Sequence, residues 1–393
     1  MIDRATVWRL GFGQLVSWGV TYYLIGVLGH RIAVDLGWSL TAVQGGFAAG
    51  LLVMGLSSPL AGRMIETYGG RRVMTAGALI GAAGCVALAL ARDAVVYYAA
   101  WAVIGLAMRL TLYDAAFAAL ARIAGRGARR AMAQITLLGG FASTVFWPVG
   151  DALADAFGWR WAAAAFGLFC ALSALLYRTL PDERHAPPPI DADTPASLAA
   201  ASAPASRLRL AAVLYALAAA LVSALNSAMS AHMIGLLAGL GLGLQSAVWT
   251  ASLRGFGQTG ARACEVLFGA RLRAVDLNLV ASVILVGGFL AALAVSGEVW
   301  VAVCFVLMFG AGNGLSTITR GTLPLAFFDP HTYGSLVGRL IAPSFLLSAA
   351  APVAYAAAIE RFGAVAAVWL SLALAAGAFA AALGLKAIAR ASR

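Results

Sequence analysis

Charged residues are scarce in this chain of 393 residues, and lysine is nearly absent. Asp, Glu, Lys and Arg together make up 11% of the residues, 62% are hydrophobic, and the mean hydropathy is +0.89. A soluble protein carries about 25% charged residues. The deficit excludes a large soluble protein and indicates a chain that lies in a lipid bilayer. Of the 27 basic residues only Lys386 is a lysine, which reflects a compositional bias.

The sequence also lacks the patterns of metal sites, nucleophilic enzymes and nucleotide-driven pumps. No two of its four cysteines have metal-ligand spacing, so we expect them to be small apolar packing residues. No cluster of His, Asp and Glu has such spacing either, and no Ser or Cys has a histidine partner in a plausible pattern. No nucleotide-binding loop occurs. The chain is therefore not expected to be an enzyme or to need a cofactor.

The net charge of +11 could suggest a partner nucleic acid, but the arginines lie in short loops between apolar runs. That pattern is typical of the loops on the inner side of a membrane. With the N-terminus inside, 18 basic residues fall in inside loops and termini and four in outside loops. We expect no nucleic-acid partner, cytoplasmic termini, and a monomer in the bacterial inner membrane.

Long apolar runs fill most of the chain. A helix needs about 20 apolar residues to cross the hydrocarbon core, so the sequence predicts an all-α membrane protein with twelve transmembrane helices. The first run follows Asp3 and Arg4 and has no cleavage site, which favours a membrane helix over a signal peptide. The predicted spans are residues 6–29, 40–62, 73–91, 95–121, 131–150, 160–180, 210–236, 245–268, 275–296, 299–323, 336–358 and 364–386.

One long connection follows the sixth span. Residues 181–209 are rich in Pro, Ala and Ser, a composition that cannot bury a core and is typical of a flexible linker. A regulatory segment is the alternative. The sequence thus predicts an N-terminal bundle of six helices in residues 1–180, a cytoplasmic linker, and a C-terminal bundle of six helices in residues 210–393.

A charged turn occurs twice. Residues 62–72 read GRMIETYGGRR and residues 262–273 read RACEVLFGARLR, each between two apolar runs. Further pairs follow in order at offsets of 201 to 205 residues: His30 and His232, Gln44 and Gln245, Pro148 and Pro352, Phe157 and Phe362. An ordered series at one period predicts two parallel repeats, an architecture of many secondary transporters.

The first turn resembles the signature of the major facilitator superfamily, and the resemblance covers essentially the whole chain. Two positions depart from the family pattern, since Glu66 replaces the usual Asp and Thr67 replaces a basic residue. The resemblance implies two pseudo-symmetric bundles of six helices and a turn that latches them on the cytoplasmic side in the outward-open state. The implied gate residues are Gly62, Glu66, Gly69, Arg71 and Arg72, with Arg262, Glu265, Gly269 and Arg271 in the second copy.

A narrower likeness concerns the substrate. The segments GWR at 158–160 and GQTGAR at 257–262 look like the oxalate/formate antiporter and monocarboxylate transporter branches of the superfamily. Trp147-Pro148 stands where its drug/proton antiporters usually have Gly-Pro, which argues modestly against drug efflux.

Arginines inside predicted spans are costly and usually face a cavity or a partner. In the eighth span Arg254, Gln258 and Arg262 share one helix face. A guanidinium offers a planar fork to a carboxylate or phosphate. We expect Arg254, near the middle of the span, to anchor an anionic substrate, or else to pair with Asp114 or another acid. Arg262, beside the repeated turn, is expected to belong to the gate.

The fourth span carries both signs of charge. Arg109 and Tyr113 share a face, whereas Asp114 is about 140° from Arg109 on a continuous helix and is not an ideal partner. A buried carboxylate can carry a proton, so Asp114 is a candidate for proton coupling. The alternative is that Asp114 neutralises an arginine.

Further candidate substrate-binding residues lie in the first, seventh and tenth spans. By the resemblance, these spans and the fourth line the central cavity. Gln14, Trp18 and Tyr22 recur at intervals of four residues, and Asn226 and Arg320 are polar positions in apolar helices.

These residues predict a secondary active transporter that moves a small, monocarboxylate-like organic anion by alternating access, with possible coupling to protons. The expected partners are the anion and the bilayer. The excess of intramembrane arginines over acids favours an anion. The alternative is drug or metabolite efflux by proton antiport in the same superfamily, with Asp114 as the proton carrier.

Overall fold

The chain is described by a computed structural model that covers residues 3–124, 128–182, 205–268, 272–328 and 333–391. Within these ranges every regular element is a helix. We call the elements before residue 181 the N-terminal half and those after residue 204 the C-terminal half. The predicted linker lies largely outside the described residues, as do the gate positions Gly269 and Arg271.

The N-terminal half comprises ten α-helices and one π-helix. They are α1 (Arg4–Ser17), η1 (Trp18–Tyr22), α2 (Leu24–Leu36), α3 (Leu40–Leu56), α4 (Ser58–Tyr68), α5 (Gly70–Leu90), α6 (Ala94–Thr111), α7 (Tyr113–Ala124), α8 (Arg129–Gly139), α9 (Ala142–Phe157) and α10 (Trp159–Arg178).

The C-terminal half comprises seven α-helices and one 3₁₀ turn among the described residues. They are α11 (Ala205–Gly239), α12 (Leu244–Ser252), α13 (Arg254–Phe268), α14 (Ala274–Leu293), α15 (Val299–Thr322), η6 (Pro324–Ala326), α16 (Tyr333–Phe362) and α17 (Ala364–Ala391).

Nine helices in the described part of the chain are long and apolar enough to cross a membrane, and α3 with α4 makes ten if this pair, bent by 52°, is one span. The other two predicted spans are interrupted helices. The first contains the π-helix, and the eighth breaks at Leu253 between α12 and α13. The all-α membrane fold is confirmed, and the count of twelve stays a prediction.

Two glycines at equivalent positions of the sequence repeat, each directly after the paired phenylalanines, have the same structural role. Gly158 and Gly363 follow a phenylalanine and end α9 and α16 with φ values of 85° and 81°. Only glycine adopts such a backbone without strain. Each therefore allows the chain to reverse at once into the next helix.

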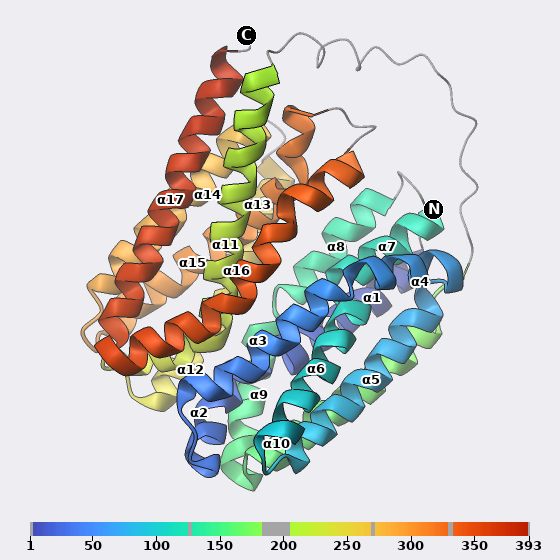
Figure 1. Cartoon of the computed structure of the whole chain (residues 1–393), viewed down its shortest axis with the longest axis vertical. Helices are drawn as coiled ribbons and strands as arrows, with labels where there is room; N and C mark the ends of the chain where they lie inside the picture. The colour runs from blue at the N-terminus through green and yellow to red at the C-terminus, as the bar shows by residue number, and fades with distance from the viewer. Residues whose placement is uncertain (1–2, 125–127, 183–204, 269–271, 329–332, 392–393) are drawn as a thin grey trace.

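The two halves lie side by side, with the start of α1 and the end of α17 at the same end of the bundle (Figure 1). We call this the terminal end and the opposite one the distal end. The ribbons of the halves approach each other near α2 and α12 at the distal end and diverge toward the terminal end (Figure 1).

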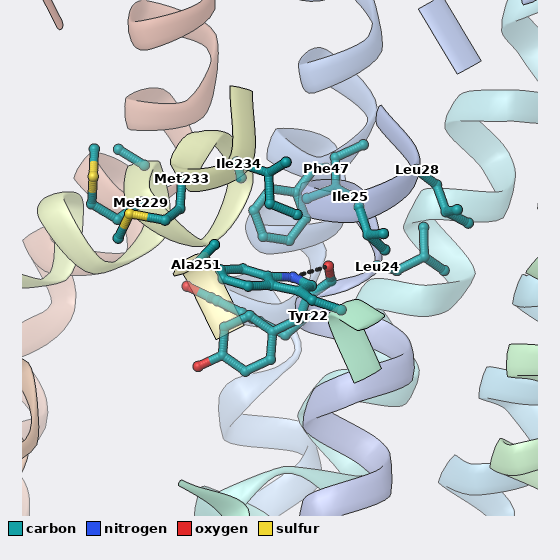
Figure 2. Close-up of a cluster of buried hydrophobic side chains, with 14 of the residues drawn as sticks. Tyr22, Leu24, Ile25, Leu28, Phe47, Met229, Met233, Ile234 and Ala251 are labelled. Atoms are coloured by element: carbon teal, nitrogen blue, oxygen red, sulfur yellow. Dashed lines mark hydrogen bonds between the residues drawn. The ribbon is translucent and has the colours of Figure 1, made fainter. Parts of the chain in front are cut away.

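Apolar side chains join the halves on the distal side of the molecule. Figure 2 shows Ile25 and Phe47 of the N-terminal half in one buried cluster with Met229, Met233 and Ile234 of the C-terminal half. The burial of such side chains contributes about 25 cal/mol per Å² of apolar surface. The cluster therefore favours the arrangement in which the distal sides are closed.

One polar contact reinforces this closure at the distal end. Glu360, at the end of α16, accepts hydrogen bonds from the backbone N–H of Thr41 at 3.2 Å and from its side-chain hydroxyl. Thr41 lies in the first turn of α3, where backbone N–H groups have no partner within the helix. A carboxylate from one half thus caps a helix of the other.

Gly26 gives a direct test of this closure. A Cβ at Gly26 would lie 2.4 Å from the carbonyl oxygen of Ser230 in the opposite half. Overpacking of this kind costs about 1–3 kcal/mol. Gly26→Val should therefore shift the population roughly tenfold toward conformations that are open at the distal end.

Distances between spin labels on the distal side would measure the shift. Val34 and Phe362 are 71% and 75% exposed and suit the labels, in a background without the exposed Cys264 and Cys304. The matched control is Gly235→Ala, where an added Cβ meets nothing within 4 Å. An unchanged distance distribution in Gly26→Val would contradict the prediction.

Candidate functional site

A cavity of about 390 Å³ lies between the halves, lined by residues from both. The N-terminal half contributes mainly η1 and the junction of α6 and α7, and the C-terminal half contributes α11, α13, α14, α15 and α16. Pockets that hold small molecules commonly measure about 300–1,000 Å³. The cavity is thus large enough for one small organic molecule.

Aromatic rings form the wall of the cavity on the N-terminal side. Trp18 contacts Tyr22 and Tyr113 with ring centroids 4.9 and 5.0 Å apart, and Tyr113 stacks on Phe117 at 5.7 Å. The indole N–H of Trp18 is buried and has no hydrogen-bond partner among the described residues. The wall therefore offers a largely apolar surface to a bound molecule.

The π-helix decides which residues of the first span reach this wall. It widens the turn at Trp18–Tyr22, so that Tyr22 and Tyr23 both line the cavity. Gln14 does not line it, because its side-chain amide donates to the carbonyl of Thr111 at 2.7 Å. An interval of four residues assumes a regular α-helix, and the wider turn breaks that assumption.

Neutral polar side chains form the wall of the cavity on the C-terminal side. They come from successive turns of α14 and α15: Asn278, Ser282, Asn313, Ser316 and Thr319. The side-chain Nδ2 of Asn278 is buried without a partner in the described structure. Sequence reasoning did not single out Asn278 and Ser282, although their spacing of four in an apolar helix is a detectable signal.

Arg109 and Asp114 form an ion pair at the edge of the cavity, with Nη1 of Arg109 at 2.5 Å from Oδ2 of Asp114. The expectation that they are poorly placed for each other was wrong because it assumed one continuous helix. The chain is extended at Leu112, with ψ of −173°, and a new helix starts at Tyr113. Arg109 is 15% exposed and Asp114 60% exposed, so the carboxylate is the accessible member of the pair.

Arg320 lines the cavity from the C-terminal half without a carboxylate partner among the described residues. Its terminal nitrogens donate to the hydroxyls of Ser223 and Ser344, each at 3.3 Å. Neutral hydroxyls orient a guanidinium but do not neutralise it. Arg320 therefore keeps its full charge for a ligand.

Arg254 is completely buried and lies behind the cavity wall. It donates to the side chains of Ser230 at 3.0 Å and Asn226 at 2.5 Å, and its Cζ lies 5.0 Å from the Phe309 ring. No described carboxylate pairs with it. The residue expected to anchor the substrate thus does not line the cavity itself, and it contacts two residues that do, Asn226 by a hydrogen bond and the Tyr23 ring at 5.4 Å.

Gln258 and Arg262 line the cavity one and two turns further along α13. Arg262 crosses to the N-terminal half and donates to the carbonyl of Thr136 at 2.7 Å. The side-chain oxygen of Gln258 is buried and has no partner in the described part of the chain. All three residues lie in α13, as the predicted shared face requires, but only Gln258 and Arg262 line the cavity, whereas Arg254 at the start of the helix is fully buried.

The first copy of the charged turn contributes no residue to the cavity lining, whereas the second copy contributes Arg262. Gly69 has a φ of 83° between α4 and α5, and the carbonyl of Glu66 accepts from Arg122 of α7 at 3.2 Å. Arg71 and Arg72 are exposed, as is Gly62, where a Cβ would meet nothing within 4 Å. Glu265, in the second copy, is partly buried. The first turn thus packs against its own half.

The charges around the cavity are unequal. Arg109, Arg262 and Arg320 line it, Arg254 lies behind it, and Asp114 is the only acid among the described lining residues. The described residues contain no group of three or more His, Cys, Asp or Glu that could hold a metal ion. The arrangement can bind an anion through guanidinium groups and hold an apolar or aromatic body against the opposite wall.

Comparisons with known proteins identify relatives of this architecture. A family profile described as Major Facilitator Superfamily matches residues 10–352. A search of curated proteins by sequence finds no match.

Solved structures share the fold at low sequence identity. A mutant of the nucleoside transporter NupG is 14% identical with a TM-score of 0.74, covering 98% of both chains. An auto-inhibited peptide transporter of the POT family is 14% identical with a TM-score of 0.71, covering 99% of this chain and 97% of its own. An inward-facing, occupied bacterial homologue of the human lysosomal transporter Spinster is 15% identical with a TM-score of 0.61, covering 98% and 95%.

Proposed function

The chain belongs to the major facilitator superfamily and is a membrane transporter rather than an enzyme, and on that premise we propose that it is a secondary active transporter of a small organic anion. The substrate binds in the cavity between the halves and crosses by alternating access. The protein acts as a monomer in the bacterial inner membrane, with the terminal end in the cytoplasm.

The imbalance of charge in the cavity carries this proposal. Three arginines line the cavity beside one carboxylate, a fourth, Arg254, lies buried behind its wall, and Arg320 has only serine hydroxyls as side-chain partners among the described residues. Uncompensated charge in a desolvated site is costly. An anionic substrate would neutralise it and accept charge-assisted hydrogen bonds, which are about twice as strong as neutral ones. A carrier of cations would need the opposite balance.

The aromatic wall supports a substrate with an apolar body. The rings from Trp18 to Phe117 line a cavity of about 390 Å³ that arginines from both halves also line. A monocarboxylate has one charged and one apolar end and matches both walls. In this mode Arg320 and Arg109 bind the carboxylate, while Trp18, Tyr22 and Tyr113 hold the remainder.

Asp114 supplies a route for proton coupling. Its carboxylate is 60% exposed and holds Arg109 in an ion pair. A substrate carboxylate that binds Arg109 displaces Asp114, and the freed carboxylate takes up a proton because an unpaired charge in a closed cavity is costly. One anion and one proton would then cross together.

The distal contacts and the charged turn support the gating part of the proposal. In this structure Glu360 and Thr41 hold the distal sides together, so the cavity would empty toward the cytoplasm. When the halves rock, Gly62, Glu66, Gly69, Arg71 and Arg72 would meet the C-terminal half and close the terminal end. Arg262 already bridges the halves near that level.

A thermal-shift screen with acetate, lactate, succinate and benzoate tests the substrate class. A ligand at 100 times its Kd stabilises the folded state by about 2.7 kcal/mol. At least one of these carboxylates should raise the melting temperature of the wild-type protein. Arg320→Gln should require at least tenfold more of it, because it loses a charged hydrogen bond of about 1.5–3 kcal/mol.

The control variant is Arg92→Gln, which removes an exposed arginine outside the cavity and should respond like the wild type. Stabilisation by neutral or cationic drugs alone would contradict the anion proposal and favour efflux. An equal response of Arg320→Gln and wild type would exclude Arg320 from the site.

A further inference from the structure

Buried Arg254 is joined to the cavity by a chain of hydrogen bonds with a fixed direction. Its Nη2 donates to the side-chain Oδ1 of Asn226 at 2.5 Å, and the Nδ2 of Asn313 donates to the same oxygen at 3.0 Å. A guanidinium has donors and no acceptor. The amide of Asn226 must therefore turn its oxygen toward Arg254 and its nitrogen the other way.

In its second contact, Arg254 is again the hydrogen-bond donor. Its Nη1 donates to the hydroxyl of Ser230 at 3.0 Å, and that hydroxyl donates its own proton to the backbone carbonyl of Asn226 at 2.6 Å. Ser230 is fully buried and does not line the cavity. This contact holds Arg254 in place without reaching a ligand.

The nitrogen of Asn226 points across the boundary between the halves. It donates to the hydroxyl of Tyr22 at 3.5 Å, and Asn226 and Tyr22 both line the cavity. Because the oxygen of Tyr22 accepts from Asn226, its own O–H proton is directed elsewhere. Asn226 thus presents a donor at the junction of the aromatic wall and the polar wall, and the Tyr22 hydroxyl has the side chain of Ser227 as a further hydrogen-bond partner.

We propose that Arg254 is a positioning residue that, by orienting the amide of Asn226, makes the Asn226–Tyr22 pair a hydrogen-bond donor for an acceptor group of the substrate. Arg254 acts on the substrate through Asn226 and does not touch it. The pair selects carboxylates over groups that can only donate. This assignment rests on the proposed transport of an anion and adds a second contact, distinct from the arginines that line the cavity.

Asn226→Asp is the decisive variant because it reverses the direction of the chain while keeping its shape. The new carboxylate pairs with Arg254, so folding should be retained, with a melting temperature at or above that of the wild type. Its oxygens can only accept, so residue 226 no longer presents a donor to the substrate. The donor face of the cavity becomes an acceptor face.

Isothermal titration calorimetry of the purified protein would measure the affinities for acetate, lactate, succinate and benzoate. Each affinity would be compared with that for the corresponding amide. We expect affinity for the carboxylates to fall at least tenfold in Asn226→Asp. Affinity for the amides should fall less, because an amide can donate to the new acceptor. Ser230→Ala, which removes only the contact that faces away from the cavity, should stay within about threefold of the wild type.

Equal carboxylate affinity in wild type and Asn226→Asp would overturn the assignment and leave the proposed function intact. An equal loss in Ser230→Ala would also overturn it, because it would show that packing around Arg254 matters and not the direction of the amide. If the wild type binds none of the four carboxylates, the proposed function itself fails and the assignment fails with it.

Discussion

Asp114→Asn should abolish proton-driven accumulation of the anion and leave exchange of anions across the membrane in place. The asparagine keeps the shape of the side chain and a hydrogen bond to Arg109, but it cannot take up a proton when the substrate displaces it. We expect accumulation driven by a pH gradient to fall at least tenfold. Proteoliposomes with an imposed pH gradient and a labelled carboxylate would measure it, and counterflow without a gradient would report the retained exchange.

Glu298→Gln is the matched control for this variant. Glu298 is an exposed acid at the start of α15 and makes no side-chain capping bond, so its loss should not affect accumulation. Normal accumulation in Asp114→Asn would assign Asp114 a purely structural role as the ion-pair partner of Arg109. Loss of both accumulation and counterflow would instead show that the charge of Asp114 is needed for transport itself.

Gly105→Val should prevent the protein from folding. A Cβ at Gly105 would lie 2.1 Å from the carbonyl oxygen of Gly50 and 2.7 Å from its Cα, where α6 crosses α3. The helices cannot separate locally, because the hydroxyl of Tyr97 donates to the carbonyl of Val43 at 2.7 Å on one side of the crossing. The clash is with the backbone of Gly50 and not with a flexible side chain, so the cost should reach or exceed about 3 kcal/mol.

Size-exclusion chromatography of the solubilised protein would measure this effect. The variant should lose the symmetrical peak of the folded monomer, whereas Gly235→Ala, in an uncrowded stretch of α11, should retain it. Gly105→Ala should show an intermediate loss. A normal peak for Gly105→Val would mean that the crossing is looser than the structure indicates.

Composition and repetition were enough to predict the class of fold. Apolar runs of about 20 residues require membrane helices, and the repeated turn at Gly69 named the superfamily. The matching ends of α9 and α16 at Gly158 and Gly363 show that the pairing of positions by offset located equivalent turns. These features depend on the local sequence and on the constant offset between repeated positions. Both can be read from a single sequence.

The details of the site could not be obtained in this way. The ion pair of Arg109 and Asp114 depends on the break at Leu112, and the place of Tyr23 in the cavity depends on the π-helix. A helical wheel assumes 3.6 residues per turn and misses both. Arg254 was expected to face the substrate, but its burial behind Asn226 is set by residues far apart in the chain, which no interval in one helix reveals.

The interrupted helices have a mechanical consequence. α3 and α4 are bent by 52° at Ser57, and the helix is also interrupted at Leu112, between α6 and α7, and at Leu253, between α12 and α13. Each break divides a span into two segments, so that the segment on the terminal side can pivot while the other stays packed. Closing the terminal end therefore does not require each half to turn as one stiff lever. It can proceed through several small hinges beside the bound molecule, each stiffened or relaxed by the contacts that the molecule makes.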